Sequence, residues 1–235
     1  SNESRRVRGD AHNSFLMKFS VHIHCCIDIL RGVFLIVSNP FDIPKARAKG
    51  RIQGSGVDSE LNETGRSQAD KFFQAYHHIS FDCIYTSELK RTVQSVDPFV
   101  RAGFKHKTMA ALNEICWGVL EGTVSTPQSH RAYLGMLEDW KAGLLDRTIA
   151  GGESPNSMYK RQQVGLTELM KNTQEKTVLI CTHGRAMRSF MCLLTGKPLA
   201  QMDEFRHSNL CLYVLQEMDN KFEVKEANSI DHLWI

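Results

Sequence analysis

Two short apolar runs of the sequence are each followed, at the opening of a predicted helix, by a side chain that can bind an anion. Arg91 follows the run Phe81–Tyr85, and His183 follows the run Thr177–Cys181. Because the ligands of an open α/β sheet bind beyond the carboxyl ends of its strands, these two side chains are predicted to lie near each other. A guanidinium, an imidazole and two helix N-termini together favour an anion site, most naturally one for phosphate.

Glu114 adds a carboxyl group in the segment Leu112–Gly118. Beside a bound phosphate, this group is suited to pass a proton to a leaving oxygen. Each residue also has a purely structural interpretation. Arg91 is then a surface arginine, His183 a buried histidine that caps a turn, and Glu114 an ion-pair partner of Arg91. Glu121 has the same ion-pairing interpretation and is left outside the predicted site.

The elements that must position these residues alternate along the chain. Short apolar runs typical of buried parallel strands are separated by segments with the apolar spacing of helices, which indicates a layered α/β domain. Thr86-Ser87 is predicted to cap a helix that starts near Glu88. The other predicted helices are Arg66–Tyr76, Leu134–Leu145, Ser157–Asn172 and one that runs through Leu194; the predicted strands are Phe19–Ile29, Val33–Val37, Phe81–Tyr85, Thr177–Cys181, Leu210–Gln216 and Phe222–Ala227.

The composition excludes several classes of protein. The chain has 235 residues, 42% of them hydrophobic and 23% charged, so it can bury one large core and is not a disordered chain. A net charge of +3 is too small to indicate a nucleic-acid partner. The apolar stretch 15–37 contains Lys18, Asp28 and Arg31 and does not predict a membrane span. Seven cysteines without a metal or disulfide spacing predict reduced thiols and a cytoplasmic protein.

Two other clusters carry weaker chemical signals. His22 and His24 would share one face of a strand, but no further ligand accompanies them and no metal is predicted. The basic run Lys45–Arg51 is typical of a solvated loop. Trp117 and Trp140 are predicted core residues.

The residues Arg91, Glu114 and His183 fall within three of seven short blocks of the chain. The blocks are Gly50–Gly54, Leu61–Ala69, Phe81–Thr92, Leu112–Glu114, Trp117–Gly122, Gly151–Ser154 and Val178–Gly184. In order and spacing, over residues 50–235, they resemble the histidine phosphatases, also called the phosphoglycerate mutase-like superfamily. The resemblance implies a three-layer α/β fold with a mostly parallel sheet and helices on both faces. It also implies activity on phosphomonoesters with no cofactor.

The resemblance assigns roles by position. Arg91 resembles the family's phosphate-binding arginine, Glu114 its general acid, and His183 its second, phosphate-contacting histidine. The expected partner is a phosphorylated small molecule or a phosphate anion, with no nucleic acid and no membrane.

The first strand departs from the family pattern. Family members carry Arg-His-Gly-Glu at the end of this strand, and that histidine is the nucleophile that becomes phosphorylated. Here Val33–Val37 is followed by Ser38–Phe41, so that Asn39 stands at the nucleophile position. The spacing to Gly50 is also about two residues longer than the motif's usual count. An Asn amide offers no basic lone pair to phosphorus. Arg51 is a candidate to replace the missing arginine as a phosphate ligand.

Three hypotheses follow from this departure. The chain is a phosphomonoester hydrolase or mutase-like enzyme, impaired or using an unusual nucleophile, for which His22 and His24 lie too far upstream. Alternatively, it binds a phosphorylated ligand without turnover. Finally, residues 1–49 are not the natural N-terminal segment, because the motif fails abruptly while every later block matches. Residues 1–32 are predicted to be an atypical extension, partly disordered or forming an extra strand, and 33–235 a single domain.

Overall fold

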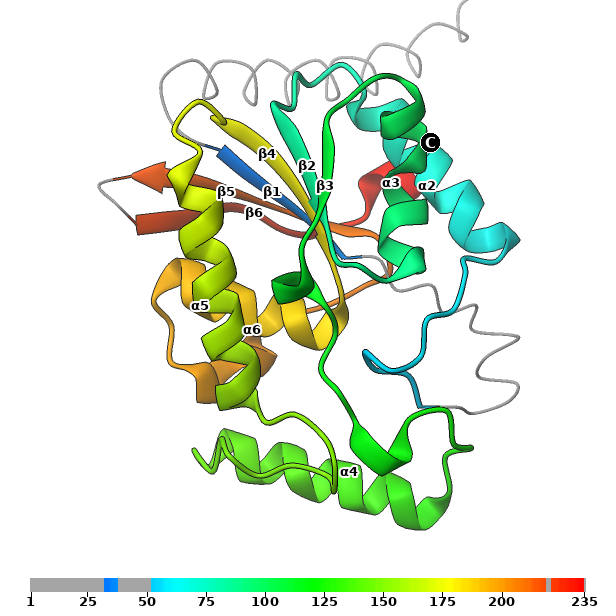
Figure 1. The fold of residues 1–235 in the computed structure, drawn as a ribbon, viewed down its shortest axis with the longest axis vertical. Helices are drawn as coiled ribbons and strands as arrows, with labels where there is room; N and C mark the ends of the chain where they lie inside the picture. Colours follow the sequence, from blue (N-terminus) through cyan, green and yellow to red (C-terminus); the bar gives the residue numbers. More distant parts are fainter. Residues whose placement is uncertain (1–31, 38–51, 219–220, 235) are drawn as a thin grey trace, which may run out of the picture.

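A six-stranded sheet organises the chain, in the order β3-β2-β4-β1-β5-β6 (Figure 1). The computed structural model describes residues 32–37, 52–218 and 221–234. β1, β2, β3 and β4 are parallel to one another, whereas β5 runs antiparallel to β1 and β6 antiparallel to β5. The strands are β1 (Gly32–Val37), β2 (Cys83–Thr86), β3 (His106–Thr108), β4 (Thr177–Thr182), β5 (Cys211–Met218) and β6 (Lys221–Ser229).

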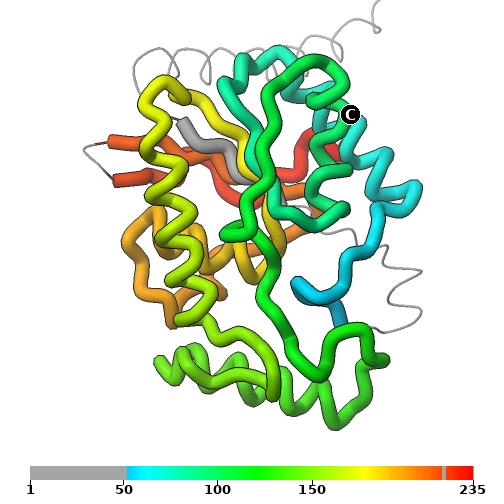
Figure 2. Tube along the Cα trace, viewed as in Figure 1, coloured from blue at the N-terminus to red at the C-terminus, as the bar shows by residue number. Residues whose placement is uncertain are grey.

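Helices flank this sheet, and one lies beyond its end. In Figures 1 and 2, α2 and α3 lie on one side of the strands, α5 and α6 on the other, and α4 lies below the sheet. The helices are α2 (Glu63–Tyr76), α3 (Lys90–Arg101), α4 (Pro127–Lys141), α5 (Pro155–Lys171) and α6 (Gly184–Thr195), with short 3-10 turns at Ala110–Leu112, Gly118–Leu120, Leu199–Glu204 and Asp231–Trp234.

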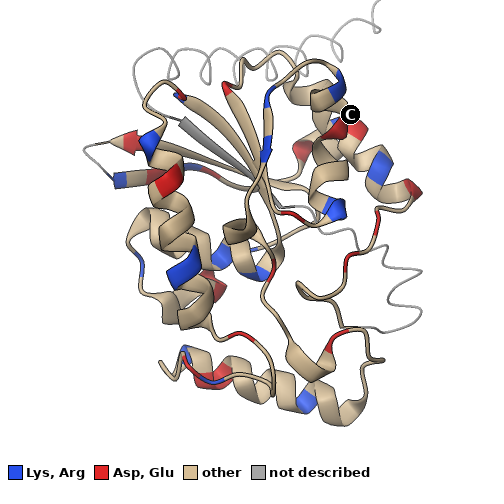
Figure 3. Ribbon diagram, in the orientation of Figure 1, with Lys and Arg blue, Asp and Glu red and all other residues tan. Residues whose placement is uncertain are grey.

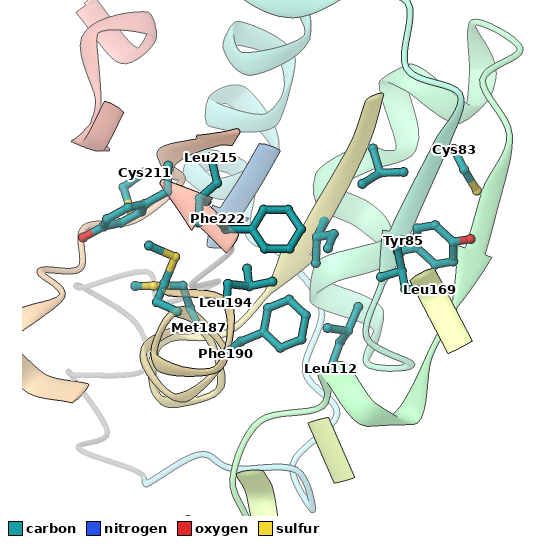
Figure 4. Packing of buried hydrophobic residues seen from close by; sticks show 14 residues of the cluster. Cys83, Tyr85, Leu112, Leu169, Met187, Phe190, Leu194, Cys211, Leu215 and Phe222 are labelled. Carbon is teal, nitrogen blue, oxygen red and sulfur yellow. The ribbon is translucent and has the colours of Figure 1, made fainter. Parts of the chain in front are cut away.

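The side chains of β4 alternate between two cores, because successive strand residues point to opposite faces. Val178 and Ile180 pack with residues of α5 and α6, whereas Leu179 and Cys181 pack with residues of α2 and α3. Figure 4 shows the first of these cores, into which Phe190 of α6 points. The predicted α/β fold, with helices on both faces of a mostly parallel sheet, is confirmed.

The carboxyl ends of three parallel strands meet at one end of the sheet. Val37, the last residue of β1, is in register with Thr182 of β4 and with Cys211 of β5. On the other side of β4, Thr86 of β2 is in register with Cys181. The segments that follow β2 and β4 are therefore neighbours, and the end of β1 lies beside them.

Helix α4 differs from its predicted range, Leu134–Leu145. It begins at Pro127 because Thr126 and Ser129 form a capping box and proline suits the first turn of a helix. It ends at Lys141. The prediction followed the apolar spacing and missed a polar first half, whose start is determined by its cap.

A third core joins α4 to α5 and α6. Trp140 of α4 stacks on Trp117, with ring centroids 6.0 Å apart, and both side chains are buried as predicted. Met136, Met158 and Met202 complete much of this cluster. Through this cluster, Ile115 and Trp117 pack against α6.

One further prediction was wrong, and one strand was missed. The N-cap position of α3 is Leu89, without a side-chain hydrogen bond, and not Thr86 or Ser87. The Ser87 hydroxyl precedes the helix and accepts from the Leu89 N–H and from Nε2 of His183. Strand β3 was not predicted, since His106–Thr108 is polar and largely exposed. The other described elements differ from prediction by a few residues at their ends, and the predicted strand Phe19–Ile29 lies outside the described residues.

The surface features of the described chain agree with the composition. Lys and Arg are mixed with Asp and Glu along the helices in Figure 3. None of the helices in the described ranges is long and apolar enough to cross a membrane. The described cysteines are free thiols, namely Cys83, Cys116, Cys181, Cys192 and Cys211.

Candidate functional site

Arg91 and His183 are in direct contact, as their positions after neighbouring parallel strands predict. Arg91 lies in the first turn of α3, and its Nε–H donates to Nδ1 of His183 over 3.0 Å. His183 is the N-cap residue of α6. Both side chains are only 2% exposed. The structure therefore joins the predicted guanidinium and imidazole in one buried pair between two helix openings.

The hydrogen bond from Arg91 determines the tautomer of His183, and a chain of hydroxyl groups continues from its other nitrogen. Because Nδ1 accepts from Arg91, the neutral ring carries its hydrogen on Nε2, which donates to Ser87 Oγ over 2.8 Å. Leu89 N–H also donates to Ser87 Oγ, so that this hydroxyl donates to Thr92 Oγ1 over 2.7 Å. Thr92 in turn donates to the Leu89 carbonyl. The imidazole is thus held at both nitrogens.

Burial and two neighbouring positive charges keep His183 uncharged. Burial lowers its pKa well below 6.5, and the positive charges of Arg91 and Arg161 lower it further. At neutral pH the site therefore contains a cationic guanidinium beside a neutral imidazole.

The remaining donors of Arg91 point to a neighbouring loop. One terminal N–H group donates to the Val57 carbonyl over 2.6 Å and another to the Gly54 carbonyl over 3.2 Å. With the bond to His183, these contacts use three of its five N–H donors, and the other two have no hydrogen-bond partner among the described residues. Burial lowers the pKa of Arg91, while nearby carboxylates, Glu114 first among them, oppose that shift.

Glu114 is held by the first turn of α6 rather than by an ion pair with Arg91 in the described chain. Its Oε1 accepts from Ala186 N–H over 3.0 Å, and its Oε2 accepts from Arg185 N–H over 3.3 Å. Oε1 also accepts from Ile115 N–H over 3.0 Å. A carboxylate at a helix N-terminus is favourable. This anchor places Glu114 beside the turn that carries His183.

Arg161 positions the segment that contains Glu114. It forms a bidentate pair with Glu153, with bonds of 2.7 and 3.0 Å. Its terminal nitrogens also donate to the carbonyls of Ala111 and Asn113, over 2.7 and 2.8 Å. Sequence reasoning missed this arginine, which has no local motif; only Glu153, within the block Gly151–Ser154, gave a signal.

Glu121 also belongs to the surroundings of Arg91, although the sequence analysis left it out. Its Oε1 accepts from Trp117 N–H over 2.8 Å. A Cβ atom added at Gly54 or Gly56 would lie 2.1 Å from a Glu121 carboxylate oxygen. At Gly54, in the loop over Arg91, the added atom would also lie 2.5 Å from the Ile115 carbonyl oxygen, so the backbone itself requires glycine there, whereas at Gly56 it would meet only the Glu121 side chain. In Figure 2 this loop runs beside the chain near residue 121, where Ile52 and Glu121 form a parallel bridge.

The side chain of Arg185, the residue after Gly184, makes contacts within the protein. Its guanidinium pairs with Asp203, donates to Tyr133 Oη over 3.2 Å and lies 5.8 Å from the Trp140 ring. The contacts with Tyr133 and Trp140 connect α4 to the first turn of α6.

Other predicted site residues are not positioned by the structure. Ser38, Asn39 and Arg51 lie outside the described residues, as do His22 and His24. Within the described ranges, no three His, Cys, Asp or Glu side chains cluster as they would around a metal ion.

Comparison with known proteins gives a consistent family. Residues 44–230 match the profile of the "Histidine phosphatase superfamily (branch 1)". The chain is 28% identical over 189 residues to Phosphoserine phosphatase 1 of Hydrogenobacter thermophilus, covering 78% of this chain and 87% of that protein. It is 25% identical to the phosphatase PhoE of Bacillus subtilis, over 78% of this chain and 88% of the relative.

Solved structures share the fold. The α-ribazole phosphatase of Shigella flexneri superposes with a TM-score of 0.73 at 20% identity, over 84% of this chain and 96% of that one. A mycobacterial glucosyl-3-phosphoglycerate phosphatase in complex with inorganic phosphate superposes with a TM-score of 0.71 at 20% identity, over 85% of this chain and 97% of that one.

Proposed function

The chain belongs to the histidine phosphatase superfamily (branch 1), and on this premise we propose that it binds phosphomonoesters between Arg91, His183 and the start of α6. The observation that carries the proposal is the 3.0 Å contact between Arg91 and His183 at the opening of α6. It combines a fixed cation with a helix N-terminus, and both favour a phosphate group. The partner is a phosphorylated small molecule.

Each residue has a distinct role in this proposal. Arg91 offers its two remaining N–H donors to the phosphoryl oxygens. His183 orients Arg91 through Nδ1 and contacts the anion when Ser87 releases Nε2. Glu114, held at the first turn of α6, exchanges a proton with the leaving oxygen.

We further propose that turnover is reduced while binding is retained. The position at which the family carries its phosphorylated histidine aligns with Asn39, whose amide is not a phosphoryl acceptor. Arg91 and His183, which we propose to hold the anion, are in contact over 3.0 Å, and this contact supports binding. Binding does not require the acceptor, whereas the covalent step does.

Thermal unfolding in phosphate, sulfate or vanadate tests the binding proposal. An anion that binds only the folded chain raises stability by about 2.7 kcal/mol at 100 times its Kd. Arg91→Ala should abolish the rise in Tm. Arg101→Ala is the matched control, because Arg101 ends the same helix and pairs only at the surface with Asp97. A Tm unchanged by all three anions would refute the proposed site.

A further inference from the structure

A second histidine, which neither the sequence blocks nor the family resemblance singles out, lies beside the opening of α6. A Cβ atom added at Gly184 would lie 3.4 Å from both Cε1 and Nε2 of His207 and 3.6 Å from Cδ2. The ring therefore lies against the residue that follows His183. His207 comes from the segment between Leu199–Glu204 and β5.

The strand register explains why this position matters. The end of β1 lies between Thr182, which precedes His183, and Cys211, which His207 precedes by a short segment. The two histidines thus belong to the two segments that flank the carboxyl end of β1, and His207 also lies beside Gly184. The resemblance places the family's phosphoryl acceptor at that end of the strand, where this chain has Asn39.

His207 also has the chemical state that a phosphoryl acceptor needs. Its Nε2 is buried and has no hydrogen-bond partner among the described residues, whereas both nitrogens of His183 form hydrogen bonds. Burial, together with the positive charges of Arg188 and Arg185, lowers the pKa of His207 to about 4, so that its ring is neutral at pH 7. Only a neutral imidazole has the lone pair that attacks phosphorus.

The other described histidines lack this combination. His106 Nε2 is bonded to Thr86 Oγ1. His232 is also buried, but its ring contacts Phe72 and Tyr76, on the opposite face of the sheet from α6.

We propose that His207 is the phosphoryl acceptor for the turnover that this chain retains, an inference that rests on the proposed phosphomonoester site. The Nε2 lone pair forms a bond to phosphorus as the bond from phosphorus to the ester oxygen breaks. The leaving oxygen takes a proton from Glu114, and the hydrogen on Nδ1 of His207 stays on the ring. Water then attacks the phosphohistidine, gives a proton to Glu114 and releases inorganic phosphate. Because Nε2 is buried, the step requires the ring to rotate toward the anion held by Arg91.

Trapping the phosphorylated chain tests the proposal. The full chain is incubated with radiolabelled acetyl phosphate, and turnover is measured with p-nitrophenyl phosphate. We expect an acid-labile, base-stable label on the peptide that contains His207. His207→Asn should lower both label and turnover about 100-fold or more. It should keep the phosphate-induced rise in Tm, which shows that the variant folds and binds. His232→Asn, at another buried histidine whose pKa is also lowered to about 4, should keep the label.

Three results would overturn the assignment of His207. These are a label on another residue, turnover that His207→Asn leaves intact, and a wild-type chain with neither label nor turnover. In the last case a phosphate-induced rise in Tm would still support the proposed binding function, so that the two proposals fail separately.

Discussion

The Nε–H of Arg91 donates to Nδ1 of His183 over 3.0 Å, and this contact determines the tautomer of the histidine, while burial first and the charge of Arg91 second keep its ring neutral. If Nδ1 carried the hydrogen, two N–H groups would face each other, and Nδ1 could not accept from Arg91. The pair therefore binds an anion through the charge of Arg91, and His183 contributes a neutral donor at Nε2.

The first prediction concerns that neutral state. His183 should remain the neutral Nε2–H tautomer at pH 6.5 and above, because burial and the charges of Arg91 and Arg161 lower its pKa well below 6.5. Arg91→Gln removes the adjacent cation and should raise the pKa of His183. Side-chain nitrogen NMR across a pH series measures both. Arg101→Gln should leave the signals of His183 unchanged, and a wild-type ring that gains a proton near pH 6.5 would contradict the assignment.

The second prediction tests the loop over Arg91. A methyl group at Gly54 would meet Glu121 Oε1 at 2.1 Å and the Ile115 carbonyl at 2.5 Å. Gly54→Ala should therefore destabilise the chain by about 2 kcal/mol and weaken phosphate binding, because the loop must move away from Arg91. Urea unfolding and the phosphate-induced change in Tm measure the two effects.

Gly135→Ala is the control for that substitution. Gly135 lies within α4 and has no atom within 4 Å of an added Cβ. Alanine there should stabilise the helix by up to about 1 kcal/mol. If urea unfolding showed no loss of stability for Gly54→Ala, as expected for Gly135→Ala, the result would contradict the close packing of this loop against Glu121.

The sequence predicted the parts of the site that depend on strand ends. Arg91 and His183 follow apolar runs that form adjacent parallel strands, and this topology alone brings them together. The contacts of Ser87 and Arg161 could not be predicted in this way. They join segments distant in sequence through single hydrogen bonds, which leave no periodic pattern.

The same limit applies to the fold. The buried strands β2 and β4 were predicted because their apolar runs are continuous. β3 is polar, and only its pairing with β2 makes it a strand. His207 gave no signal either, since its place beside Gly184 depends on how the chain returns to β5.

The third prediction is loss of stability in acid. The pKa values of His207 and His232 are lowered to about 4 in the folded chain, from about 6.5 in the unfolded chain. Between these values the unfolded chain binds more protons. Stability is therefore complete above about pH 6.5 and falls toward pH 4, by at most about 1.4 kcal/mol per pH unit for each histidine.

Urea unfolding at a series of pH values measures this dependence. His232→Leu should reduce the slope between about pH 4 and 6.5, because one buried base has been removed. His130→Leu, at an exposed position of α4, should leave the slope unchanged. A stability that is flat across this range in the wild-type chain would contradict the prediction.

The last prediction addresses the end of β1 directly. Val37 lies between Thr182 and Cys211, so a turn grafted after it would start beside His183. Replacing Ser38–Phe41 by Arg-His-Gly-Glu, with about two residues removed before Gly50 to match the motif spacing, should supply both a cation and a neutral imidazole. We expect turnover of p-nitrophenyl phosphate to rise about 100-fold or more.

The position of the label distinguishes the possible routes in that variant. The acid-labile phosphate should move to the grafted histidine, because it replaces the acceptor that the family carries at the strand end. Adding His183→Ala should then lower turnover sharply, since the anion loses a neutral donor and Arg91 loses its Nδ1 partner. Asn39→His alone should restore less, because Ser38 provides no guanidinium for the phosphoryl group. A folded graft that binds phosphate but turns over no faster than the wild-type chain would show that the missing motif is not what limits activity.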